Sequence, residues 1–163
     1  MNVLLPVNMQ PQARSNWCWA AVASSTGTYL RAENPAGALS QCEVANAILQ
    51  LANCCADPDS CNVTAGLDDA LQVVGHLNDQ PFDGVATFDS IRTLTSPPYN
   101  VPVGVRVANG ADGHFLLIVG FLDDDGRQWI HTVDPLYGPG TYDINDFASS
   151  YQGASWTNTY SID

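Results

Sequence analysis

The chain has 163 residues, enough for one domain with a sizeable core and too few for two comfortable ones. Its net charge is −12, with no lysine and five arginines, and this acidic balance argues against a nucleic-acid partner. No apolar run approaches the length of a membrane span, so a membrane protein is not expected. The first residues, MNVLLPV, lack the basic segment and cleavage site of a signal peptide.

In the first part of the chain, apolar residues recur at helical spacing. This spacing predicts an alanine-rich helix over 16–30, capped by Ser15 or Asn16. A second helix is expected after Ser40, where SQCE has the Ser-x-x-Glu capping box. A third is expected over 66–75 and a shorter fourth in FDSIRTLT.

After TSPPYNVPV (95–103), the apolar runs become short and β-rich. They predict strands in NVPVGVRVA, HFLLIVGFL, RQWIHTVD and SWTNTYSI, with a short helix in DINDFASSY. HFLLIVGFL is apolar on both faces, as expected of a central, covered strand. Helices followed by antiparallel strands predict an α+β fold. We expect a single domain over 1–163, with a helical lobe over about 12–98 and a β lobe over about 99–163.

The five cysteines divide into a cluster of four and an isolated Cys18. The cluster predicts two disulfides, and adjacent cysteines cannot easily bond to each other. Two pairings remain open: Cys42–Cys54 with Cys55–Cys61, or Cys42–Cys55 with Cys54–Cys61. A zinc site is the rival interpretation, which the absence of a C-x2-C pair disfavours. Disulfides indicate an oxidising compartment, where the unpaired Cys18 thiol requires an explanation.

Cys18 lies between Trp17 and Trp19, where the first predicted helix begins. Only the thiolate is a useful nucleophile, and the partial positive charge at a helix N-terminus favours an anion. The two tryptophans are bulky enough to anchor this helix end in a core. The alternative interpretation of Cys18 is a small buried core residue.

Three histidines could act as a base for this thiol. His76 lies at a helix end and His131 lies within a strand, whereas His114 opens the central strand after the flexible NGADG. DDDG predicts a tight hairpin, and a three-residue loop centred on Asp124 would set His114 directly opposite Asp134. A four-residue loop would displace this pairing by one. Because His131 and Asp134 would point to opposite faces, the hairpin favours His114 as the base and Asp134 as its orienting carboxylate.

A cysteine nucleophile also needs donors for the developing oxyanion. Gln12 precedes Cys18 by six residues, and its side-chain amide could join the Cys18 backbone N–H in this role. Gln10 is a nearby alternative.

The motifs Q-x5-C-W-A, GHF-x-x-IVGF and VDP together resemble the papain-like cysteine peptidases, especially a compact bacterial group of secreted effector proteases and peptide toxins. The resemblance spans most of the chain. It implies Gln12 as oxyanion donor, Cys18 as nucleophile on a long helix, His114 as base on a barrel-like β lobe, and Asp134 as its orienter. The clustered cysteines also look like this group. Position 134 is Asp rather than the Asn of papain, and PLYG replaces the tryptophan that often follows.

The predicted function is therefore a cysteine endopeptidase that hydrolyses peptide bonds of proteins. The resemblance implies an exported bacterial effector or toxin, secreted or delivered by a bacterial secretion system. We expect a monomer that has a protein or peptide substrate, with an immunity or inhibitor protein as a further partner, and that uses no cofactor or metal and binds no nucleic acid or membrane. The same triad could instead carry out deamidation, transglutamination or acyl transfer. An inactive binding module is a further alternative, which the complete set of four residues disfavours.

Overall fold

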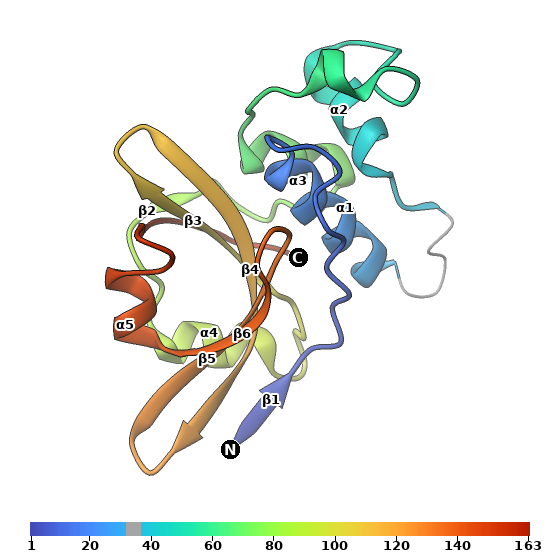
Figure 1. Cartoon of the computed structure of the whole chain (residues 1–163). Coiled ribbons are helices and arrows are strands. Elements are labelled where there is room, and N and C mark those ends of the chain that lie inside the picture. The colour runs from blue at the N-terminus through green and yellow to red at the C-terminus, as the bar shows by residue number, and fades with distance from the viewer. Residues whose placement is uncertain (32–36) are drawn as a thin grey trace.

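The computed structural model describes residues 1–31 and 37–163, and it has a helical part and a sheet part (Figure 1). The helical part contains α1 (Cys18–Leu30), α2 (Gln41–Leu49), the 3-10 helix η2 (Pro58–Cys61) and α3 (Leu67–Val74). The sheet part contains β2 (Phe82–Asp83), α4 (Phe88–Thr95), β3 (Val103–Asn109), β4 (Asp112–Asp124), β5 (Arg127–Asp134), β6 (Gly138–Asp143), α5 (Ile144–Ser149) and β7 (Ser155–Tyr160). The predicted α+β fold is confirmed. Among the described residues, no helix combines the length and the apolar character needed to cross a membrane.

Helix α1 is the centre of the helical part, and its residues 18–27 are all buried. Its alanines and serines are small, so α2, α3 and β4 can all pack closely around it. The helix begins two residues later than predicted. Trp17 is the N-cap and makes no side-chain capping hydrogen bond, so the expected cap by Ser15 or Asn16 is wrong.

The start of α2 and both ends of α3 lie where the sequence predicts. Ser40 and Glu43 form the complete capping box at the start of α2, which satisfies amide groups that the helix itself leaves unpaired. Helix α3 begins after Gly66 and ends at Gly75, whose φ of 81° is the left-handed conformation that glycine adopts at little cost.

The strands form one antiparallel sheet in the order β2-β7-β3-β4-β5-β6. An additional N-terminal strand, β1 (Asn2–Leu4), pairs with β4 just beyond the last residue of β4 that pairs with β3. Strands β1, β2 and β6 were not predicted, because they are too short or too rich in glycine and proline to show a strand pattern.

The hairpin between β4 and β5 differs from its predicted form. Asp124 pairs with Arg127, so the loop contains only Asp125 and Gly126. Both loop residues have positive φ, 48° and 86°, as two-residue hairpins of the primed type require. The three-residue and four-residue loops expected from the sequence are therefore both wrong, and His114 is not directly opposite Asp134. The ladder also contains a β-bulge between Ile118 and Gly120.

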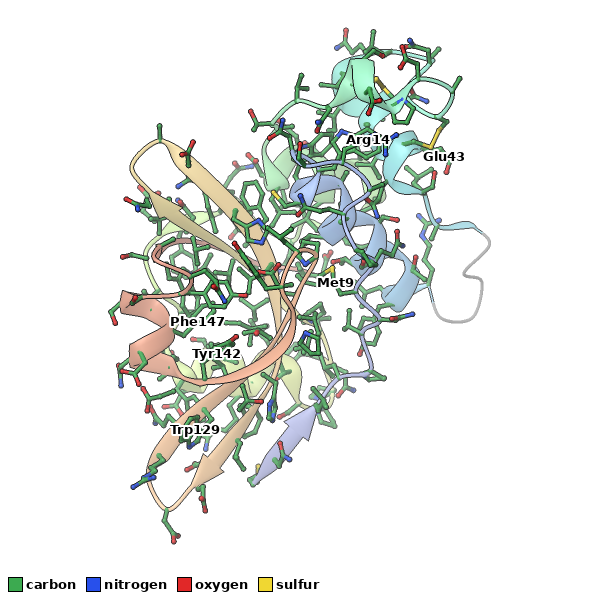
Figure 2. The ribbon with its side chains drawn as sticks, in the orientation of Figure 1. Met9, Arg14, Glu43, Trp129, Tyr142 and Phe147 are labelled. Carbon is green, nitrogen blue, oxygen red and sulfur yellow. A yellow bond between two sulfur atoms is a disulfide. The ribbon has the colours of Figure 1, made fainter. Side chains whose placement is uncertain are left out.

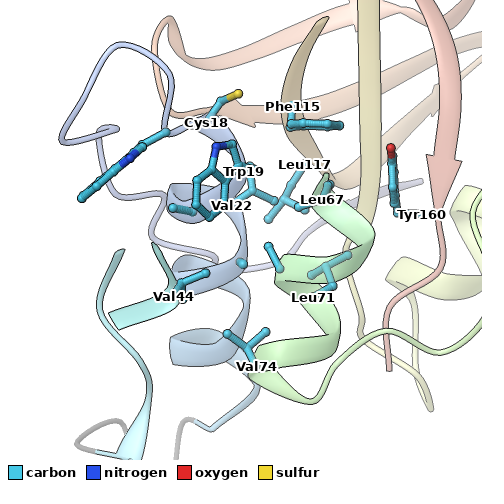
Figure 3. Close-up of a cluster of buried hydrophobic side chains, with 14 of the residues drawn as sticks. Cys18, Trp19, Val22, Val44, Leu67, Leu71, Val74, Phe115, Leu117 and Tyr160 are labelled. Carbon is cyan, nitrogen blue, oxygen red and sulfur yellow. The ribbon is translucent and has the colours of Figure 1, made fainter. Parts of the chain in front are cut away.

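Strand β4 is covered on both faces, as predicted. Phe115, Leu117 and Val119 belong to the core of the helical part, shown in Figure 3. Leu116 and Ile118 point the other way, into a second core enclosed by the curved sheet. One strand thus joins two hydrophobic cores.

Helix α4 packs in the second core, where Phe88 and Ile91 are buried against the sheet. It precedes residue 98 in sequence, yet it covers the sheet rather than the helices. Figure 2 shows Tyr142 and Phe147 in the sheet part of the molecule, and Arg14 and Glu43 in the helical part. The division of the chain at about residue 98 stays a prediction.

The four clustered cysteines form two disulfides, Cys42–Cys55 and Cys54–Cys61. This is the second of the two pairings that the sequence left open, and it excludes the zinc interpretation because all four sulfur atoms are bonded. Cys18 is the only cysteine of the chain with a free thiol; none of the five lies outside the described residues.

Candidate active site

Cys18 is the first residue of α1 and lies at the edge of the core of the helical part (Figure 3). It retains 8% of its surface exposed, whereas its neighbours Trp17 and Trp19 are almost completely buried. The first amide groups of a helix have no partner within it, and here no side chain caps them. They remain available to an anion at Cys18, and the helix dipole favours negative charge there.

The two tryptophans hold the start of this helix through their indole N–H groups. Trp17 Nε1 donates to the carbonyl oxygen of Cys61 at 2.8 Å, and Trp19 Nε1 donates to that of Val63 at 3.1 Å. The ring bodies fill the core while the polar tips bind backbone on the same neighbouring segment. The tryptophans therefore fix the backbone on both sides of Cys18.

The same segment also binds the loop that leads into α1. The Asn16 backbone N–H donates to Asn62 Oδ1 at 2.9 Å, and Asn16 Nδ2 donates to the Asn62 carbonyl at 3.0 Å. Asn62 Nδ2 in turn donates to Ser15 Oγ at 2.9 Å. Because the Cys54–Cys61 disulfide ends next to Asn62, it anchors the segment that positions this loop.

His114 lies near the start of β4 with one ring nitrogen directed at Asp134. Its Nε2 is 2.9 Å from both carboxylate oxygens of Asp134. The Cys18 thiol lies close enough to His114 to help raise its pKa, and Nδ1 is the ring nitrogen that Asp134 leaves free to face it. The structure thus brings Cys18, His114 and Asp134 together in this order.

The bulge in β4 decides that His114 and Asp134 share a face. A two-residue loop pairs Asp124 with Arg127, and in an uninterrupted ladder this register would set Asp134 opposite Leu117, on the face away from His114. The extra residue at Val119 shifts the register, so that Leu117 pairs with Val133, the last pair of the ladder; the same register continued by one residue would set Asp134 opposite Leu116. His114 and Asp134 are then diagonal neighbours on one face.

The imidazole of His114 is surrounded by groups that favour its charged form. Burial lowers its pKa, but hydrogen bonds and negative charge from Asp134 and Cys18 outweigh burial and raise the pKa to about 9. The side chain of His114 keeps 21% of its surface exposed, enough for contact with a substrate.

Asp134 is fully enclosed and all its polar contacts stabilise a carboxylate. Oδ1 accepts from the backbone N–H groups of Leu136 and Tyr137 at 2.7 and 3.0 Å, and Oδ2 accepts from the hydroxyl of Tyr151 at 2.8 Å. Burial alone would raise the pKa of Asp134, but the contacts with His114 and the backbone donors lower it. Burial and the charge of Asp134 raise the pKa of Tyr151, so its hydroxyl remains a donor.

Tyr151 is a member of this site that the sequence analysis missed. It follows α5, lies 17 residues from Asp134 and is 2% exposed. No spacing rule connects two residues on separate elements, so only the fold reveals the contact.

Gln12 lies close to the site but its amide is already engaged. Its Nε2 donates to the carbonyl oxygens of Ser15 at 2.8 Å and Arg14 at 3.1 Å, which uses both N–H groups. Among the described residues its Oε1 is buried without a partner. Its backbone N–H donates to the carbonyl of Pro135, next to Asp134, at 3.0 Å.

The other two histidines and Gln10, which the sequence offered as alternative base and oxyanion donor, lie away from the contact between His114 and Asp134. His76 Nδ1 contacts the Asp163 carbonyl, and His131 lies between Thr141 and Asn2, away from Asp134. The Gln10 side chain binds Ser24 on α1 and accepts from Gln41.

Residues 2–152 match the family described as Papain-like cysteine protease AvrRpt2. The chain belongs to this family. Members of this family are papain-like cysteine proteases, in agreement with the resemblance of the sequence motifs. This chain is therefore a papain-like cysteine protease. No curated protein matches its sequence at a significant level.

Solved structures show the same fold. A chain from a study of the mite allergens Blo t 1 and Der p 1 superimposes with a TM-score of 0.63 at 13% identity, covering 99% of this protease and 70% of the allergen chain. Digestive procathepsin L 3 of the Tenebrio molitor larval midgut gives a TM-score of 0.62 at 12% identity, covering 98% of this protease and 68% of that chain. The papain-like fold is thereby confirmed.

Two hollows adjoin the site of this AvrRpt2-family protease. One, of about 550 Å³, is lined mainly by residues 7–11 and the turn 133–139, with Met9 and Leu136 among its apolar side chains. Figure 2 shows Met9 between the helical and sheet parts. The other, of about 510 Å³, includes Asn16 and Gly113, close in sequence to Cys18 and His114. In the described residues, no group of three or more His, Cys, Asp or Glu side chains is arranged to hold a metal ion.

Proposed function

We propose that this protein is an endopeptidase in which Cys18 is the nucleophile, His114 the general acid and base, and Asp134 the residue that orients His114. The observation that carries the proposal is the hydrogen bond of His114 to the buried carboxylate of Asp134, with the Cys18 thiol near enough to raise the pKa of the same imidazole. A thiol at an uncapped helix start, with a base within reach and that base held by a third group, is the arrangement that activates a nucleophile.

The proposed cycle follows from this arrangement. The Cys18 thiolate attacks the peptide carbonyl carbon, a sulfur–carbon bond forms, and the carbonyl oxygen takes the negative charge. The protonated His114 gives its proton to the leaving nitrogen as the carbon–nitrogen bond breaks. His114 then removes a proton from water, which attacks the thioester and releases the second product and the thiolate.

The oxyanion is stabilised by the Cys18 backbone N–H and by Gln12. Both N–H groups of the Gln12 amide bind carbonyls of its own loop in the free protein. We propose that one of them exchanges the Arg14 carbonyl, the longer contact at 3.1 Å, for the substrate oxygen. Loss of one such donor typically costs about 2.7–4 kcal/mol of transition-state stabilisation.

The resemblance to secreted bacterial proteases and two disulfides support a setting outside the producing cytoplasm. We therefore extend the proposal to a monomeric bacterial effector or toxin that is secreted or delivered by a secretion system. Its partners are a protein or peptide substrate and an immunity or inhibitor protein.

The test treats a protein lysate with the parent and with Cys18→Ala, and identifies new chain ends by mass spectrometry. We expect new ends only with the parent, and labelling of Cys18 by a thiol-reactive peptide. Equal cleavage by Cys18→Ala would refute the nucleophile. A gain of about one dalton on glutamine, or an added group without a cut, would instead assign deamidation or acyl transfer to the same triad.

A further inference from the structure

The hollow of about 510 Å³ beside the proposed nucleophile contains one positive charge, that of Arg106. Asn16 forms part of its wall two residues before Cys18, and Gly113 forms part of it directly before His114. A peptide held with its carbonyl at Cys18 therefore passes this hollow with a side chain close to the bond that is cut.

Arg106 lies on the face of β3 that points toward the helical part. Its neighbours Val105 and Val107 are buried in the core enclosed by the sheet, so Arg106 points the other way. Gly104 shares the face of Arg106, and a Cβ placed on it would lie 3.3 Å from Leu67 of α3. Arg106 thus faces the helical part together with Phe115, whereas His114 pairs with Val107 and starts from the other face of the same ladder.

The guanidinium of Arg106 is held in place within this hollow. Its Nη1 donates to Thr157 Oγ1 at 3.0 Å. Its Nε, Nη2 and Cζ lie against Gly113, because a Cβ on Gly113 would be only 2.7–2.9 Å from them. The absence of a side chain at position 113 makes room for the guanidinium next to His114.

The charge of Arg106 has no acidic partner among the described residues. Arg14 and Arg92 pair with Asp59 and Asp89, but no such pair includes Arg106. In a chain of net charge −12, a partly buried guanidinium without a carboxylate retains its donors for an anionic ligand. Asp112 also lines the hollow, but its side chain is exposed and forms no ion pair with Arg106.

We propose that Arg106 is a specificity-determining residue and that this protease prefers substrates with an Asp or Glu side chain seated in the hollow. This inference rests on the proposed function of Cys18 and His114. A guanidinium offers parallel donors to both oxygens of a carboxylate, whereas the neutral amide of Gln or Asn gains less. We expect a Glu-containing peptide to be cleaved with about 10–100-fold higher kcat/KM than the same peptide with Gln.

The experiment first maps the cleavage preference of the parent with a peptide library, then measures kcat/KM for a matched Glu and Gln peptide pair. We expect Asp and Glu to be enriched at one position near the cut. Arg106→Gln should remove the difference between the two peptides, and Arg106→Glu should favour a Lys peptide instead. Asp112→Asn should strengthen the preference for Glu because it removes a repelling charge.

Arg92→Gln is the matched control, since it removes an exposed arginine on α4 and should leave the preference unchanged. Alkylation of Cys18 by uncharged iodoacetamide reports on the nucleophile independently of peptide charge. Cleavage by the parent without acidic enrichment, or an unchanged Glu-to-Gln ratio in an Arg106→Gln variant that is still alkylated normally, overturns the inference. If the parent neither cleaves peptides nor reacts at Cys18, the proposed function fails and the inference fails with it. If Arg106→Glu does not fold, the ratio of kcat/KM for the Glu and Gln peptides in the parent still tests the preference for an acidic side chain.

Discussion

His114 and Asp134 are in hydrogen-bond contact although they are not opposite each other in the β4–β5 ladder. Asp134 directly follows Val133, the partner of Leu117, and His114 Nε2 reaches its carboxylate along the diagonal at 2.9 Å. The one-residue bulge at Val119 decides that both side chains share a face.

Asp134→Asn should move the alkaline limit of activity to lower pH. With Asp134 present, the pKa of His114 is about 9, so the imidazolium that protonates the leaving group persists to that pH. The amide removes the negative charge that raises this pKa, and kcat/KM should begin to fall at lower pH than in the parent. The measurement is a pH profile of kcat/KM for both proteins; coincident alkaline limbs would contradict the assigned role.

The same pair should make stability depend on pH. The pKa of His114 is raised on folding, so its contribution is fully present below about 6.5 and is lost as pH rises through about 9. The pKa of Asp134 is lowered, so its contribution is present above about 3.8 and is lost as pH falls through its folded value. Urea unfolding of the parent should therefore show a decline of stability from pH 6.5 to 9, larger than that of Asp134→Asn.

Tyr151→Phe should lower kcat by about 10-fold with little change in KM. The substitution keeps the buried ring and removes only the hydroxyl that donates to Asp134 Oδ2 at 2.8 Å. Tyr151 acts through Asp134 and does not touch the reacting atoms. The measurement is steady-state kinetics together with the pH profile, where the alkaline limb should also shift. Tyr142→Phe, on a neighbouring tyrosine that makes no contact with Asp134, is the control. A change confined to thermal stability would mean that Tyr151 only packs.

Gly120→Ala should destabilise the protein by about 1–3 kcal/mol. A Cβ at position 120 would clash with the carbonyl oxygen of Val3, so β1 must move away from β4. Gly27→Ala is the control: its Cβ would meet Val74 at an ordinary 3.5 Å, and alanine stabilises a helix interior relative to glycine. In urea unfolding, the free energy of unfolding should be lower than that of the parent for Gly120→Ala and higher for Gly27→Ala.

Removal of the two disulfides should have unequal effects on activity. Replacing either pair by alanine should cost about 2–3 kcal/mol of stability. Only Cys54–Cys61 anchors the segment that binds Trp17, Trp19 and Asn16, so its loss should also slow the alkylation of Cys18. The comparison of alkylation rates in Cys54→Ala/Cys61→Ala and Cys42→Ala/Cys55→Ala tests this. Equal rates would show that the segment does not position the nucleophile.

Local signals in the sequence determined the start of α2, the ends of α3, the central strand and the isolated cysteine. The capping box at Ser40 and the glycine at position 75 each act within a single helical turn. The uninterrupted apolar residues of β4 indicate that both faces of this strand are buried. The order of Gln12, Cys18, His114 and Asp134 is likewise legible without coordinates, because each residue sits in a short motif of its own.

Only the tertiary structure decided how these residues meet. The bulge at Val119, the hydroxyl of Tyr151 on Asp134 and the hold of Asn62 on the loop before Cys18 all join segments that are distant in sequence. Such contacts depend on strand register and on packing between elements, and no local propensity encodes a one-residue shift of register. The disulfide pairing was decided in the same way, since two pairings fit the spacing and only one fits the folded helices.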